Sequence, residues 1–288
     1  MQTSAKSVIL DLLSTLRRNA LPVRLLVAAA ALFGINENGL RVALARLLAA
    51  GLVERDERGL YRLAGKAEAV NRETTSWRSV EQSLRPWGGS WIGAFLPRKS
   101  GGTRRDRTGR ALAFLGFREL EAGLHVRPDN LAGGVDAARS RLTDLGLDAA
   151  ALVASLASLD ATTEARARSL WDVASLRAGY RRTRLQLERS AERLSRLDPA
   201  HAMVESFLLG GQAIRQIVFD PRLPEEMLPG AERRELVARM LDYDKSGRAC
   251  WAPLMREAGA SNLRTPAQLR VVDGDGRLAP PDAAFIAG

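Results

Sequence analysis

The chain has 288 residues, of which 46% are hydrophobic, so it can bury a sizeable core, which favours a folded protein over global disorder. Its formal net charge of +10 favours a polyanionic partner such as nucleic acid. A codon composition that favours arginine would produce the same excess of basic residues. A single cysteine, Cys250, excludes an internal disulfide framework and a zinc site of several thiolates. The longest apolar run, residues 25–35, is too short to span a membrane, so we expect a cytoplasmic protein with no membrane partner.

The first seventy residues predict a helix–turn–helix followed by a β-hairpin. Apolar periodicity and capping residues indicate helices over about 8–16, 23–33 and 36–50. Residues 52–64 contain two short apolar segments around the turn 56–59, which is the pattern of a hairpin. This order is typical of a winged helix-turn-helix, a DNA-binding module.

The third of these helices has a face suited to the major groove. At 100° per residue, the inward side gathers Leu40, Ala43, Leu44, Leu47 and Leu48. The opposite side presents small or short polar residues between two arginines, although an ordinary surface helix can look similar. Together with the hairpin, this pattern predicts DNA contacts from Asn36, Asn38, Arg41, Val42, Ala45, Arg46 and Arg58.

The middle of the chain predicts a small α+β domain. Strands are expected over 91–96, just before Pro128, and over 151–159, with helices over about 107–116 and 136–145. A basic loop covers 98–110. This order suggests a ferredoxin-like fold.

The remainder of the chain is expected to be helical. Apolar periodicity predicts one long helix over about 165–197 and further helices near 203–219, 232–241 and 251–258. Three prolines make 220–230 an extended connection, and the last twenty-odd residues look poorly ordered. The fold class is therefore mainly helical α+β, with domains at 1–70 (winged helix-turn-helix), 71–163 (ferredoxin-like) and 164–288 (helical, for effector binding and dimerisation).

No group of residues predicts catalysis, so we expect no enzyme, no catalytic residue, no metal and no cofactor. The segment starting at Asp242 imitates a calcium loop, but Pro253 stands where a bidentate glutamate is needed. Cys250 has no imidazole placed beside it by the sequence, since His125 and His201 are isolated. No lysine has the spacing of a nucleotide-binding loop.

Two basic patches lie outside the first domain. Arg177, Arg181 and Arg184 form a stripe at i, i+4 and i+7 of the long helix, and the loop 98–110 holds six basic residues. Either patch can meet phosphates through guanidinium groups, or can be merely a solvated face.

Five segments resemble the PaaX family of bacterial transcriptional regulators. They are LFGINENGLRVALARLLAAGLVERDERGLYRLAG, WGGSWIGAFLP, LGFRELEAGLHVRPDNL, LWDVASLRAGY and DPRLPEEMLP. The resemblance implies a winged helix, a ferredoxin-like domain, a helical C-terminal domain, and a commonly dimeric repressor of aromatic-acid catabolism relieved by an aryl-CoA thioester such as phenylacetyl-CoA. Two features depart from the family: the turn carries Asp56 and Glu57, and Gly39 in the third helix costs up to about 1 kcal/mol of helix stability.

The resemblance also suggests where an aryl- or acyl-CoA effector would bind. Guanidinium groups would hold its phosphates and aromatic residues its acyl group, at or between the middle and C-terminal domains. The candidates are Trp91, Arg98, Arg104, Arg105, Trp171, Arg177, Tyr180, Arg181 and Arg184. The expected partners are double-stranded operator DNA, this effector, and a second copy of the chain that contacts the first outside residues 1–70.

Two other functions remain open at this stage. The chain could be an interaction protein that has lost DNA binding, as the acidic turn suggests. It could also be a metal-dependent nuclease, but the strand at 91–97 has no carboxylate to hold a metal.

Overall fold

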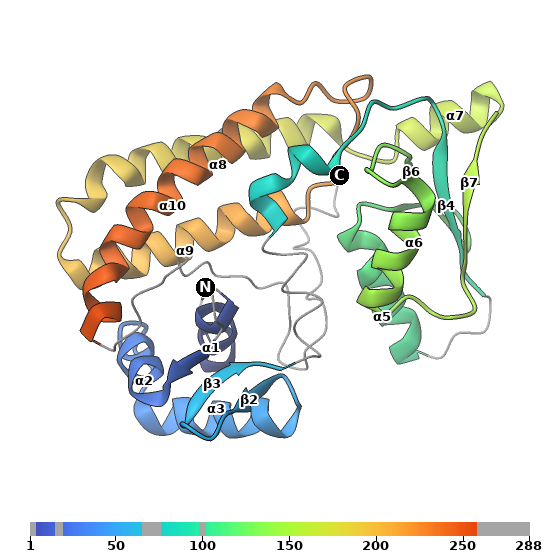
Figure 1. Cartoon of the computed structure of the whole chain (residues 1–288). Helices are drawn as coiled ribbons and strands as arrows, with labels where there is room; N and C mark the ends of the chain where they lie inside the picture. The colour runs from blue at the N-terminus through green and yellow to red at the C-terminus, as the bar shows by residue number, and fades with distance from the viewer. Residues whose placement is uncertain (1–3, 15–19, 65–75, 98–101, 258–288) are drawn as a thin grey trace. The chain divides into compact units, whose positions relative to one another are not determined.

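A computed structural model describes residues 4–14, 20–64, 76–97 and 102–257 (Figure 1). The predicted end of the first helix, near Leu16, and the predicted poorly ordered C-terminus lie outside these residues. The chain is a mixed α+β protein with two small antiparallel sheets and a helical C-terminal region.

The structure divides into two compact units. The first contains the described residues within 1–78, 182–217 and 235–277, and the second those within 79–181 and 218–234. Helices α8 (Val173–Leu194), α9 (Pro199–Val218) and α10 (Ala231–Glu257) contribute residues to both units. The three domains expected from the sequence, and the two boundaries between them, stay a prediction.

The first unit begins with the expected helices and hairpin. Its elements are α1 (Ala5–Ser14), β1 (Ala20–Pro22), α2 (Val23–Ala31), α3 (Glu37–Ala49), β2 (Val53–Arg55) and β3 (Leu60–Leu63). The sheet has the order β1-β3-β2, and both pairings are antiparallel (Figure 1). The sequence did not predict β1, because a three-residue strand with one buried side chain, Leu21, has no detectable period.

The core beneath α3 continues into the C-terminal helices. The leucines of α1 and α2, and those of α3 except Leu48, are buried together with Phe207 of α9 and Trp251 of α10. The rings of Phe33 and Phe207 lie 5.0 Å apart, and Trp251 donates a hydrogen bond from Nε1 to the Met203 carbonyl at 3.0 Å. Residues distant in sequence therefore support the N-terminal helices in one apolar cluster.

The second unit contains a four-stranded sheet together with helices. Its elements are η2 (Glu81–Ser83), β4 (Trp91–Phe95), α5 (Gly102–Phe114), β5 (Arg118–Glu121), β6 (Leu124–Pro128), α6 (Gly134–Leu145), β7 (Leu152–Leu156) and α7 (Ala161–Arg168). From β4 to β7 the order is β–α–β–β–α–β. The antiparallel sheet runs β5-β6-β4-β7, and α6 packs on β7 (Figure 1).

Two predictions for this unit were wrong. The strand β5 was missed because its sequence, RELE, is polar and lies at the edge of the sheet. The helix expected over 107–116 begins at Gly102, so most of the segment expected as a basic loop, 98–110, is helical.

The remaining helices correct the predicted C-terminal pattern. The short helix η1 (Ser76–Ser79) precedes η2, and the C-terminal helices are α8 (Val173–Leu194), α9 (Pro199–Val218) and α10 (Ala231–Glu257). The single helix expected over 165–197 is two, because Asp160 and Asp172 cap α7 and α8 separately. The two helices expected at 232–241 and 251–258 are one, which continues through Pro253 with Trp251 and Met255 buried around it. The connection 220–230 has no helix or strand, as predicted.

Candidate nucleic-acid interface

Helix α3 separates into a buried and an exposed face. Leu40, Ala43, Leu44 and Leu47 are buried in the core of the first unit. Leu48, expected on the same side, is instead 37% exposed, since it lies at the edge of that face in the last turn. The opposite face is exposed as the periodicity predicted and carries Asn38, Arg41, Val42, Ala45, Arg46 and Ala49.

The N-terminus of α3 is fixed by its cap. The Asn36 side chain accepts a hydrogen bond from the Gly39 backbone N–H at 2.8 Å. A Cβ atom at position 39 would lie 3.1 Å from that same Asn36 oxygen. Gly39, which looked merely destabilising in the sequence, therefore leaves room for the cap.

The exposed polar groups of α3 differ in their partners. Arg41 donates to Glu37 from Nε at 2.8 Å and from Nη2 at 2.5 Å. Within the described parts of the chain, the side chains of Asn38 and Arg46 have no hydrogen-bond or ion-pair partner. One amide and one guanidinium on this face are thus available to a ligand.

In the turn between β2 and β3, one of the two acidic residues is hydrogen-bonded within the turn itself. Asp56 accepts hydrogen bonds from the backbone N–H groups of Arg58, at 3.0 Å, and Leu60, at 2.8 Å. Gly59 completes the turn with φ +77°. The acidic residue that departs from the family pattern therefore stabilises the turn, while the Arg58 side chain is exposed.

Two of the aromatic residues predicted to bind an effector lie together in the second unit. The rings of Trp91 and Trp171 are stacked with centroids 6.2 Å apart, and both side chains are buried. Trp91 Nε1 donates to Glu164 at 2.7 Å. The buried Nε1 of Trp171 has no hydrogen-bond partner among the described residues.

The arginine stripe predicted on the long helix is already paired with carboxylates. Arg177 and Arg181 both bind Glu232, with Nε–oxygen distances of 3.1 and 2.7 Å. The hydrogen bond from Arg177 lowers the pKa of the Glu232 carboxyl, and Arg181 adds to this effect. Arg184 binds Glu188 at 2.8 Å. An effector's phosphates would have to compete with these carboxylates.

The other predicted effector residues are less informative. Arg105 is exposed on α5. Arg104 lies in α5 with its side chain outside the description, and Arg98 lies outside the described residues altogether.

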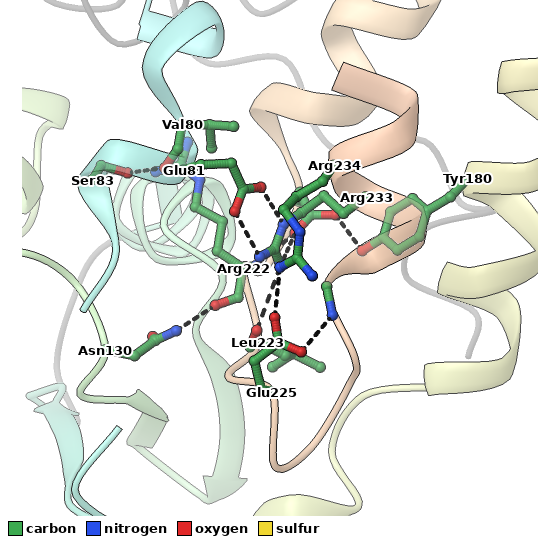
Figure 2. Close-up of polar contacts among 12 residues, drawn as sticks. Val80, Glu81, Ser83, Asn130, Tyr180, Arg222, Leu223, Glu225, Arg233 and Arg234 are labelled. Atoms are coloured by element: carbon green, nitrogen blue, oxygen red, sulfur yellow. Dashed lines mark hydrogen bonds and ion pairs between the residues drawn. The ribbon is translucent and has the colours of Figure 1, made fainter. Parts of the chain in front are cut away.

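A polar cluster that sequence reasoning missed lies in the second unit, around residues 220–223 (Figure 2). The Tyr180 hydroxyl donates to Asp220, and burial together with the charge of Asp220 raises the pKa of this tyrosine. Asn130 donates to the Arg222 carbonyl at 2.7 Å, and Arg233 binds Glu81 at 2.9 Å. These residues come from five separate segments, so no spacing in the sequence could have revealed them.

A second buried guanidinium lies close to this cluster. Arg127 on β6 donates to the carbonyl groups of Leu115 and Pro128 and to Asn130, whose Oδ1 is 3.0 Å away. Burial lowers its pKa to about 9, and the nearby charge of Arg222 contributes. Arg127 therefore remains cationic at neutral pH and is held by neutral acceptors.

Among the described residues, Cys250 and the two histidines have no catalytic arrangement around them. Burial raises the pKa of the Cys250 thiol and lowers the pKa of His125, which disfavours a thiolate and an imidazolium respectively. Among the described residues, no three His, Cys, Asp or Glu side chains are grouped as metal ligands. None of the described helices is long and apolar enough to cross a membrane.

Two family models match the chain. One, described as PaaX-like protein, covers residues 4–67, and the other, PaaX-like protein C-terminal domain, covers residues 171–247. The chain is also similar to a solved structure, the uncharacterized protein Rv0674 from Mycobacterium tuberculosis, with 25% identity and a TM-score of 0.55. That match covers 86% of this chain and 98% of the other. No curated protein matches the chain.

Proposed function

Because the chain belongs to the PaaX-like family of transcriptional regulators, we propose that it is a ligand-responsive repressor that binds operator DNA through α3. The observation that carries this proposal is the exposed face of α3. Its opposite face is buried, its N-terminus is capped, and Asn38 and Arg46 have no partner elsewhere in the described chain.

The surrounding elements support the same function. Two helices joined by a short turn, followed by the β2–β3 hairpin, have the order of a winged helix-turn-helix, whose second helix enters the major groove. Arg58 lies in the turn of that hairpin, where a wing would approach a phosphate. The β–α–β–β–α–β order of the second unit is that of a ferredoxin-like domain.

DNA binding can be tested with one variant and one matched control. Duplexes enriched from a random library by the full chain serve as probes in fluorescence anisotropy. Arg46→Ala should weaken binding by about 1–3 kcal/mol if its guanidinium contacts a base. Arg189→Ala removes another exposed arginine, on α8, and should change affinity far less. If the two variants lower DNA affinity equally, α3 is not the helix that contacts DNA.

The same probes separate the proposal from its alternatives. Incubation with Mg²⁺ should retard the duplex without cleaving it. Cleavage would favour a metal-dependent nuclease, and failure to bind any duplex would favour an interaction protein.

For the effector we propose a CoA thioester that binds the second unit, on the basis of the family resemblance. The stacked and buried Trp91 and Trp171 would supply the aromatic contacts to an aryl group, and Arg177 and Arg181 would exchange Glu232 for the phosphates. Tyr180 belongs to the same part of the chain.

Reciprocal coupling provides the test of this effector. If a thioester lowers the affinity of the chain for DNA, then DNA must lower the affinity of the chain for the thioester by the same factor. Titration of aryl- and acyl-CoAs, with free CoA as control, should yield at least one such compound. If none binds the chain and none changes its affinity for DNA, this effector class is wrong.

A further inference from the structure

Val42 is an apolar side chain on the exposed face of α3. It lies in the middle of α3 and is 44% exposed, whereas Ala43 and Leu44 beside it are buried. Among the described residues, five large hydrophobic side chains are at least 37% exposed. Of these five, Val42 is the one at the centre of the candidate interface. Covering this apolar area with another surface is energetically favourable, because it removes the area from water.

The neighbours of Val42 let another surface come close. Ala45 and Ala49 follow on the same exposed face, and alanine extends no further than its Cβ atom. Asn38 precedes Val42 by four residues, so the two side chains are neighbours on that face, with Cβ atoms about 5–6 Å apart. The centre of α3 therefore presents an isopropyl group beside an amide that has no partner in the described chain.

The chemistry of this pair matches one kind of base pair. In the major groove, thymine presents a C5-methyl group, and adenine presents N7 as acceptor and N6 as donor. An asparagine amide pairs with the adenine atoms, and an apolar side chain covers the thymine methyl. Guanine and cytosine edges offer no methyl group, so they would leave Val42 against polar atoms.

We propose that α3 recognises A·T pairs at its centre, with Val42 packed against a thymine methyl group and Asn38 hydrogen-bonded to adenine. This inference rests on the proposed function, because it requires α3 to enter the major groove. Arg46, four residues after Val42, then lies toward the flanking bases or phosphates. Val42 and Asn38 thus carry the preference for A·T pairs, and Arg46 adds a base or phosphate contact beside them.

Removal of single methyl groups from the DNA tests the contact of Val42. Each thymine of an enriched duplex is replaced in turn by uracil, which lacks only the C5-methyl group, and affinity is measured for the full chain and for Val42→Ala. At least one position should weaken wild-type binding about fourfold, the factor expected for one buried methyl group. The same replacement should not change the affinity of Val42→Ala. The variant already lacks the contact between Val42 and the thymine methyl group, so removing the methyl group removes nothing further.

Two controls distinguish this contact from general effects. Leu185→Ala removes an exposed leucine of α8 and should retain the full response to uracil. Replacement of adenine by 7-deazaadenine removes the N7 acceptor and should weaken the wild type but not Asn38→Ala.

The outcomes separate the two levels of the proposal. If no duplex is enriched, the proposed function and this inference fall together. If a duplex is bound specifically but no thymine responds to uracil, or the response persists in Val42→Ala, DNA binding stands and the role of Val42 is overturned.

Discussion

Arg41 and Arg46 lie on the same exposed face of α3 but differ in their partners within the folded chain. Arg41 is held by Glu37 through two hydrogen bonds, whereas Arg46 has no partner within the described chain. An exposed ion pair of this kind contributes about 0.2–1 kcal/mol, so a phosphate can displace Glu37 at modest cost. The carboxylate itself repels DNA.

Glu37→Gln should therefore tighten DNA binding by about two- to fivefold, because it frees Arg41 and removes a negative charge. Anisotropy titrations at fixed salt measure the change. Glu192→Gln makes the same charge change on α8 and provides the control. If both variants gain equally, the effect is one of net charge and Arg41 has no specific role.

Gly116 shows how a single residue positions the connection at 220–223. It has φ +77°, and an added Cβ atom would lie 2.8 Å from Pro221 Cα. Gly89, in the same unit, has φ +83° with nothing within 4 Å. The two positions share the backbone strain but differ in the available space.

Gly116→Ala should consequently destabilise the protein more than Gly89→Ala. Left-handed strain costs each variant about 1–2 kcal/mol, and the clash with the Pro221 backbone adds about 1–3 kcal/mol to the first. Denaturant unfolding of both variants measures the difference. Equal loss of stability would show that Pro221 moves aside without cost.

The elements of the first unit were largely predictable from the sequence, because each has its own local signal. Helix α3 has an apolar period, a cap at Asn36 and a terminating Gly51, and the hairpin has a turn around Gly59. The break between α7 and α8 was missed, because the apolar period continues across it while the decisive signal is the side chain of Asp172. Strands β1 and β5 form only because distant partners pair with them.

Asp172 provides a test of that break. Its carboxylate accepts hydrogen bonds from the Ser175 hydroxyl and the Ser175 backbone N–H, and the first of these is the main cause of its lowered pKa. Asp172→Ala should lower the melting temperature by about 2 °C at pH 6. Because the folded-state pKa is lowered, this contribution is complete above the unfolded pKa and is lost as the pH falls through the folded pKa.

Thermal melts across that acidic range, with Asp172→Asn as control, measure the effect. Asparagine keeps the cap acceptor without a titrating group, so its difference from Asp172→Ala should persist in acid. A wild-type advantage over Asp172→Ala that is independent of pH would contradict the role of the carboxylate.

At the scale of the whole molecule, the site was predictable where one element carries it and not where several converge. The exposed face of α3 follows from periodicity alone. The cluster around Asp220 joins residues from positions 81 to 233, and the pairing of Arg177 and Arg181 with Glu232 depends on how α8 meets α10. The arginines that form a basic stripe in the sequence are therefore ion-paired with carboxylates in the structure.

Assembly is a further property of the whole chain. A single winged helix contacts a small, charged interface, and specificity generally requires two half-sites related by a twofold axis. We expect a homodimer formed outside residues 1–70. Sedimentation equilibrium at micromolar concentration, with and without DNA, should show it, and a monomer under both conditions would refute it.

The ratio of two affinities tests the central claim most directly. The full chain is titrated with an enriched duplex and with a scrambled duplex of the same length and composition, at the same physiological salt. Sequence-specific regulators bind their sites at least about 10³-fold more tightly than other DNA, and we predict a ratio of that order. Equal affinities for the two duplexes would contradict the account, because the +10 charge alone would then explain the binding.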